Sequence, residues 1–249
     1  MTGFEPFSLQ HTLIVTACLG VIAAFVWLGV IAGRRERWVR FGWVGLCVIA
    51  ESVTGWYWLT NWDPGVSLPL HVCNIASLLA PVALLFPARW LRIILYFWGL
   101  GLSTQAFLTP LVHEGTAFWL FWVNHTQIVG TAVYLLVIEG YRPDWRDYRN
   151  ITIINAGYAV VISAINLSFG FNYAYIGNQL PEATTLMHKL GPWPWRVFVA
   201  WAIVQAVFAA MVAAWMPWAA DDELNEPMFE PRASGTDPNE DSGEFASPH

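Results

Sequence analysis

Seven apolar stretches alternate with short polar segments along residues 13–216 of the 249-residue chain. Each is close to the roughly 20 residues that an α-helix needs to cross the ~30 Å hydrocarbon core of a bilayer. The stretches lack the period-two alternation of a transmembrane β-strand, so backbone hydrogen bonds must close within helices. The pattern predicts an all-α polytopic membrane protein, a bundle of seven transmembrane helices, with spans at about 13–33, 41–58, 68–86, 92–110, 117–138, 151–170 and 195–216.

Basic residues are unequally divided between the two sets of predicted loops. One side carries only Lys189 and Arg196, and the other carries Arg34, Arg35, Arg37, Arg40, Arg89, Arg92, Arg142, Arg146, Arg149 and Arg232. Because cytoplasmic loops of membrane proteins are enriched in Lys and Arg, this alternation predicts an external N-terminus and a cytoplasmic C-terminus. We expect a multi-pass protein of the cell membrane.

Composition supports this class and separates off the C-terminal end. Hydrophobic residues make up 56% and charged residues 12% of the chain, against about 25% charged residues in a soluble domain. The chain beyond Pro217 carries nine acidic residues and one basic residue among Pro, Ser and Gly. We therefore predict a membrane domain over 1–218 and a disordered acidic tail over 219–249. The sequence has no basic patch that would indicate a nucleic-acid partner.

Polar residues fall at a similar depth in five of the predicted spans. At ~1.5 Å per residue, the five lie on the order of 6–12 Å below the predicted outer edge; they are Glu51, Cys73, Gln105, His125 and Asn166. Polar groups at such depths usually face the bundle interior or a cavity, although each alone could also serve helix packing. Gly101, Gln105 and Thr109 share one helical face by spacing. The layer predicts an outward-opening pocket, also lined by His71, Asn74 and Asn124.

Cys73 and His125 are the residues in this layer with acid–base or nucleophilic chemistry. His71 and Cys73 lie about 200° apart around a helix, so a base for the thiol must come from another span. His125 is the only histidine deep within a span, whereas His11 lies in an outer segment and is expected to face water. A thiol near a helix N-terminus with a histidine base predicts nucleophilic catalysis. The alternative is that both are packing residues.

Five ordered motifs carry a family resemblance: LPLHVCN at 68–74, YFWGL at 96–100, QAFLTP at 105–110, NYAYI at 172–176 and GPWPW at 191–195. Together they resemble the YwaF family of bacterial integral membrane proteins, which is distantly similar to a eukaryotic transmembrane family of phospholipid acyltransferases. By that resemblance, Cys73 matches the acyl-accepting cysteine and His125 matches the histidine of that family. We expect the last two motifs to form a rigid outer loop over the pocket, because prolines limit the freedom of its backbone.

Three functions are compatible with these observations. The first is a lipid acyltransferase or lipid hydrolase that takes membrane lipids and needs no cofactor, with Asn74 or Gln105 steadying the oxyanion. The second is a metal-binding hydrolase that draws its ligands from His71, Cys73, His125 and Glu51. The third is a small-molecule receptor or transporter that binds a ligand in the pocket without chemistry.

Overall fold

The computed structural model describes residues 4–110, 115–180 and 186–216. The chain divides into two units, Met1–Trp215 and Met216–His249, and the predicted tail over 219–249 lies outside the described residues. All regular structure in the described part of the first unit is helical. The elements are α1 (Leu9–Ala32), η1 (Gly33–Arg35), α2 (Glu36–Thr60), α3 (Val72–Leu85), α4 (Arg89–Ile94), η2 (Leu95–Leu102), η3 (Ser103–Phe107), α5 (Gly115–Val137), α6 (Trp145–Phe169), η4 (Tyr173–Tyr175), η5 (Leu186–Lys189) and α7 (Trp195–Ala213).

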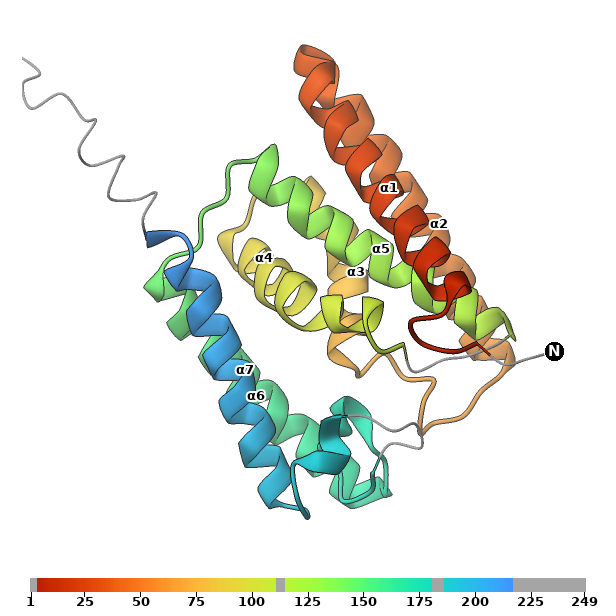
Figure 1. The fold of residues 1–249 in the computed structure, drawn as a ribbon, viewed down its shortest axis with the longest axis vertical. Coiled ribbons are helices and arrows are strands. Elements are labelled where there is room, and N and C mark those ends of the chain that lie inside the picture. The colour runs from red at the N-terminus through yellow and green to blue at the C-terminus, as the bar shows by residue number, and fades with distance from the viewer. Residues whose placement is uncertain (1–3, 111–114, 181–185, 217–249) are drawn as a thin grey trace, which may run out of the picture. The chain divides into compact units, whose positions relative to one another are not determined.

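The predicted apolar stretches all contain helix, which confirms the all-α prediction. Among the described residues, four helical stretches are long and apolar enough to cross a membrane: Leu9–Thr60, Gly115–Val137, Trp145–Phe169 and Trp195–Ala213. The first of these contains both α1 and α2, which lie side by side (Figure 1). Helix α3 has only 14 residues, and the fourth predicted span is divided among α4, η2 and η3. The count of seven spans and the orientation therefore remain predictions.

Helix α5 lies at the centre of the bundle. It packs against α1, α2, α3 and η2. In its most apolar 18-residue segment 67% of the residues are buried, compared with 17–22% in the corresponding segments of the other three candidate spans. Close approach depends on small residues: Gly130 faces Trp43, whose ring stacks on Phe25 at a centroid distance of 4.0 Å. The indole nitrogen of Trp43 also donates to the Thr131 hydroxyl at 3.0 Å. This packing fixes α5 against its neighbours.

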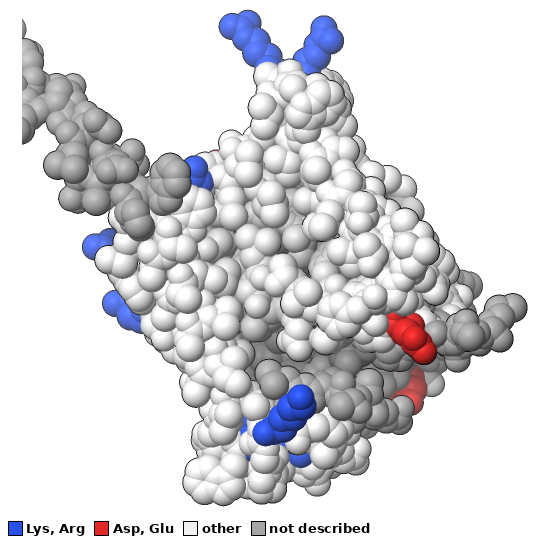
Figure 2. All heavy atoms as spheres, in the orientation of Figure 1, with Lys and Arg blue, Asp and Glu red and all other residues white. Residues whose placement is uncertain are grey.

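Ion pairs join the helices at the end where α2, α4 and α6 begin. The Arg89 guanidinium donates two hydrogen bonds of 2.8 Å to the buried Asp147 carboxylate, which also accepts from the Tyr141 hydroxyl at 2.9 Å. Arg92 donates to Glu139 at 2.6 Å. In Figure 2, charged side chains gather toward the ends of the helices, and the face between them is almost free of charge. This is the end predicted to be cytoplasmic.

The helix over 89–107 does not keep one periodicity, and the predicted shared face of Gly101, Gln105 and Thr109 is therefore wrong for Gly101, whereas Gln105 and Thr109 line one cavity. It begins as the α-helix α4, widens to a π-helix in η2 and tightens to a 3-10 helix in η3. Gly101 packs against Phe208 and Met211 of α7 and does not line the cavity. Changes of helix type shift the angular position of every following side chain.

His11 is buried, contrary to the expectation that it faces water. Only 4% of the residue is exposed. Its Nε2 lies 3.0 Å from the Phe107 carbonyl oxygen, and its Nδ1 accepts from the Phe7 N–H at 2.8 Å. A carbonyl can only accept, so Nε2 carries the proton. The imidazole thereby ties the start of α1 to the end of η3.

Candidate functional site

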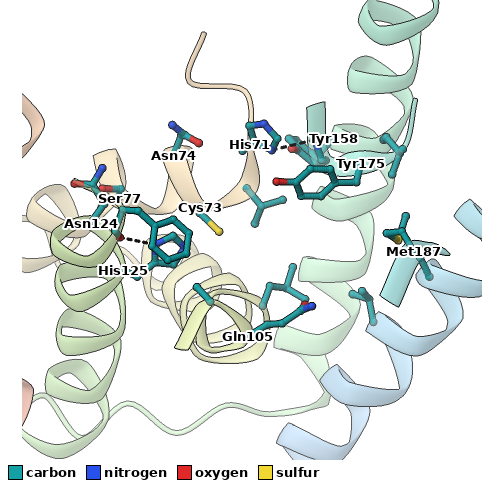
Figure 3. A pocket seen from close by; sticks show the side chains of 18 of the residues that line it. His71, Cys73, Asn74, Ser77, Gln105, Asn124, His125, Tyr158, Tyr175 and Met187 are labelled. Carbon is teal, nitrogen blue, oxygen red and sulfur yellow. Dashed lines mark hydrogen bonds between the residues drawn. The ribbon is translucent and has the colours of Figure 1, made fainter. Parts of the chain in front are cut away.

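A cavity of about 540 Å³ lies between α3, the η2–η3 segment, α5, α6 and α7. Its size falls within the range of small-molecule pockets, roughly 300–1,000 Å³. Most of its wall is apolar. Six of the residues predicted for the site line it, as Figure 3 shows in part: His71, Cys73, Asn74, Gln105, Asn124 and His125.

Cys73 occupies the first turn of α3, immediately after Val72. The backbone N–H groups of a first turn have no intrahelical acceptor, and together with the helix dipole they favour a negative charge. The Ser103 hydroxyl lies 3.5 Å from Cys73 Sγ and 2.9 Å from the Trp98 carbonyl oxygen. Its single proton can serve only one of these at a time. Ser103 can therefore release the carbonyl and donate to a thiolate when one forms.

His125 approaches Cys73 from α5. Its Nδ1 lies 2.7 Å from the Phe121 carbonyl oxygen, and because a carbonyl only accepts, Nδ1 is the protonated nitrogen of the neutral ring. The lone pair then resides on Nε2. The side chains of Cys73 and His125 line the same cavity, close enough for each to influence the ionisation of the other. The structure thus brings together a thiol and an imidazole whose tautomer leaves it able to accept a proton.

Two amide side chains of the cavity wall have their polar groups available. In the described part of the chain, the side chains of Asn74 and Gln105 make no hydrogen bond. Asn124, in contrast, exchanges hydrogen bonds of 3.3 Å with the Thr54 hydroxyl. Asn74 and Gln105 are therefore free to bind a ligand in the cavity.

Glu51 does not line the cavity that contains Cys73, so its predicted place in the pocket needs correction. It lines a smaller adjoining cavity of about 240 Å³, which shares Thr54, Trp58, Asn74, Ser77 and Asn124 with the larger one. The Glu51 carboxylate accepts hydrogen bonds from the Ser77 hydroxyl and the Gln127 amide. The angular position of Glu51 on α2 turns it toward α3 and α5. Gln127 was not singled out by the sequence.

Asn166 was also predicted to line the pocket, and this prediction is wrong. The residue is 1% exposed. Its amide donates to the Tyr173 carbonyl and accepts from the Tyr173 N–H, both at 2.9 Å. Asn166 therefore fixes the loop after α6. That loop, rather than Asn166 itself, reaches the cavity through Ala174, Tyr175 and Ile176.

The residues proposed as metal ligands do not form a ligand group. Within residues 4–110, 115–180 and 186–216, no three His, Cys, Asp or Glu side chains are placed to hold one ion. His71 instead accepts a hydrogen bond at Nδ1 from the Ala174 N–H at 3.3 Å. The metal-binding hydrolase therefore receives no support from the arrangement of these four residues.

Comparison with known proteins identifies a family. Residues 6–212 match the family model described as the TMEM164 family. No curated protein and no solved structure matches the chain. The match agrees with the expected membrane-protein class, which the apolar helices also support, while the resemblance to the YwaF family stays a prediction. Since the match covers almost all of the described helices, the chain belongs to the TMEM164 family.

Proposed function

We propose that the protein is a membrane-embedded acyl-transfer enzyme, a lipid acyltransferase or lipid hydrolase, with Cys73 as nucleophile and His125 as general base. The observation that carries the proposal is the commitment of His125 Nδ1 to the Phe121 carbonyl, which leaves Nε2 as the proton acceptor beside the thiol. A base within reach of the nucleophile and oriented by a third group is the arrangement that activates a thiol.

The proposed reaction uses these two residues, an ester that supplies the acyl group, and an alcohol or water that accepts it. Nε2 of His125 takes the Cys73 proton, and the thiolate attacks the ester carbonyl to form a C–S bond. The C–O bond of the ester then breaks, and the imidazolium returns its proton to the leaving alkoxide. His125 then takes the proton of a second alcohol, or of water in the hydrolase case, as its oxygen attacks the thioester; the C–S bond breaks, and the proton passes to the sulfur to regenerate the thiol. Proton transfer of this kind contributes about 10²–10⁴-fold to a rate.

The walls of the cavity favour a lipid as substrate. The sides contributed by α6 and α7 consist largely of apolar residues, among them Ala159, Val197, Ala200, Trp201 and Val204. Such walls suit an acyl chain, because burying each CH₂ group stabilises the complex by about 0.8 kcal/mol. The polar side chains lie around Cys73, where an ester group would be placed. By the predicted orientation, lipid enters sideways from the outer leaflet of the cell membrane.

A thioester trap tests the proposal. The purified protein in detergent is incubated with phospholipids that carry an alkyne-tagged acyl chain, and the covalent label is tested for release by hydroxylamine. We expect a hydroxylamine-sensitive label that disappears in Cys73→Ala. Cys47→Ala is the matched control, because Cys47 is buried at 1% exposure and lies outside the cavity; it should keep the label.

Two outcomes would contradict the proposal. An undiminished label in Cys73→Ala would remove the role of the thiol. Saturable binding of the labelled lipid to the wild-type protein without any covalent product would instead favour the receptor or transporter alternative.

A further inference from the structure

The loop that follows α6 holds two consecutive residues in a strained backbone conformation. Ala174 and Tyr175 have φ values of 54° and 59°, in the left-handed region that residues other than glycine rarely adopt. Strain of this kind persists only where the surroundings enforce it, and it is concentrated at functional sites.

Hydrogen bonds on both sides of the strained residues hold the loop. The Tyr173 hydroxyl donates to the Pro64 carbonyl at 2.7 Å and accepts from the Leu68 N–H at 3.2 Å. Arg196, only 3% exposed, donates to the Gly177 and Gln179 carbonyls. With the bonds from Asn166 and to His71 described above, these contacts fix the loop against the segment that leads into α3 and Cys73.

The side chain that this loop presents to the cavity is Tyr175. Its ring lies against that of His71 at a centroid distance of 5.3 Å, and in Figure 3 the hydroxyl end of the ring is directed into the pocket on the side of Cys73. The hydroxyl makes no hydrogen bond within the described ranges. Burial, reinforced by the nearby charge of Cys73, raises the pKa of Tyr175 to about 12. The phenol therefore keeps its proton at neutral pH and is available as a donor.

We propose that Tyr175 is a catalytic residue that donates a hydrogen bond to the carbonyl oxygen of the ester attacked by Cys73. This inference rests on the function proposed above. As the C–S bond forms, the π electrons of the carbonyl move to its oxygen, and the phenol stabilises that charge without giving up its proton. The charge returns to the carbonyl when the C–O bond breaks. The strained loop explains why this donor is fixed before the substrate binds, as an oxyanion site requires.

The substitution Tyr175→Phe tests this assignment, because it removes only the hydroxyl oxygen. Two rates are measured on the full-length protein in detergent: formation of the Cys73 thioester from alkyne-tagged phospholipids, and alkylation of Cys73 by iodoacetamide, followed by mass spectrometry of the Cys73 peptide. Alkylation proceeds by direct displacement and develops no oxyanion. Tyr148→Phe is the control, since Tyr148 lies on α6 outside the cavity and its hydroxyl has no hydrogen bond among the described residues.

We expect Tyr175→Phe to slow thioester formation by about 10²–10³-fold, the usual effect of removing one oxyanion donor, with the alkylation rate unchanged. Tyr148→Phe should change neither rate. Thioester formation within threefold of the wild-type rate would overturn the proposal. A parallel loss of both rates would overturn it too, because the tyrosine would then act on the thiol or on the fold.

The result separates this inference from the proposed function. If Cys73→Ala keeps the label, the acyl-transfer function fails and Tyr175 has no reaction to assist. If Cys73→Ala loses the label while Tyr175→Phe reacts at the wild-type rate, only the role of Tyr175 fails. The two substitutions therefore give different patterns for the two failures.

Discussion

Replacing His125 by glutamine isolates its role as a base. Glutamine retains an amide that can donate to the Phe121 carbonyl, as His125 Nδ1 does at 2.7 Å, but it has no nitrogen that accepts a proton. The fold is therefore expected to persist. General-base catalysis contributes about 10²–10⁴-fold, which corresponds to about 2.7–5.4 kcal/mol of transition-state stabilisation at 1.36 kcal/mol per tenfold change. We expect His125→Gln to lose thioester formation by this factor at pH 7.

The pH dependence of this loss distinguishes a base from a packing residue. The assay is single-turnover formation of the Cys73 thioester, measured for both proteins between neutral and alkaline pH, with thermal unfolding in detergent as the control for folding. In alkaline solution hydroxide ionises the thiol directly, so the deficit of His125→Gln should shrink as the pH rises. A rate within threefold of wild type at pH 7 would refute the reasoning. A large deficit that is the same at every pH would refute it as well.

Two further substitutions test the packing of the bundle. In Gly130→Ala the new Cβ would lie 2.9 Å from a ring carbon of Trp43, so we expect the free energy of unfolding to fall by about 1–3 kcal/mol. The control Gly157→Ala, whose Cβ would have no atom within 4 Å, should be neutral or slightly stabilising in the same thermal unfolding assay. Equal unfolding of the two variants would contradict the packing argument. Asp147→Asn weakens the paired hydrogen bonds from the half-exposed Arg89. Chemical denaturation should show that the free energy of unfolding falls by about 1–2 kcal/mol, a value between those of an exposed ion pair and a buried charged hydrogen bond. An unchanged denaturation midpoint would contradict this prediction.

The sequence predicts the helices and the depth of polar groups, because both follow from spacing along the chain. Apolar runs locate the helices, and a rise of ~1.5 Å per residue locates a side chain along the helix axis. Depth and elimination together selected Cys73 and His125, which line one cavity; their catalytic roles remain a proposal. Angular position is a different matter, since it depends on how each helix is rotated against its neighbours. Glu51 and Asn166 were misplaced for that reason.

Changes of helix type and contacts between distant segments leave little trace in hydropathy. The apolar run over 92–110 looks uniform, although its backbone changes from α to π to 3-10 geometry and thereby brings Ser103 to Cys73. His11 was expected to face water because its position near the N-terminus is outside the apolar core. Its acceptor is Phe107, 96 residues away. The NYAYI motif was recognised, but the direction of Tyr175 depends on contacts with residues far away in sequence.

The candidate site lies where the helices are interrupted, and the physics of a bilayer explains why those interruptions can exist there. A backbone carbonyl released from a helix costs several kcal/mol in hydrocarbon unless it finds a partner. Two carbonyls at such breaks each accept a hydrogen bond from a side chain: Leu70 from the Tyr158 hydroxyl at 2.7 Å and Phe107 from His11 Nε2 at 3.0 Å. The Trp98 carbonyl accepts from both the backbone N–H and the hydroxyl of Ser103. These donors support irregular backbone within the bundle, where α3 begins at Val72 and carries Cys73 in its first turn. The polar side chains that support the breaks thus also support the backbone that holds the residues that would carry out the chemistry. For that reason, substitutions of Ser103, Tyr158 or His11 should disturb the cavity even though only the first of them contacts the thiol.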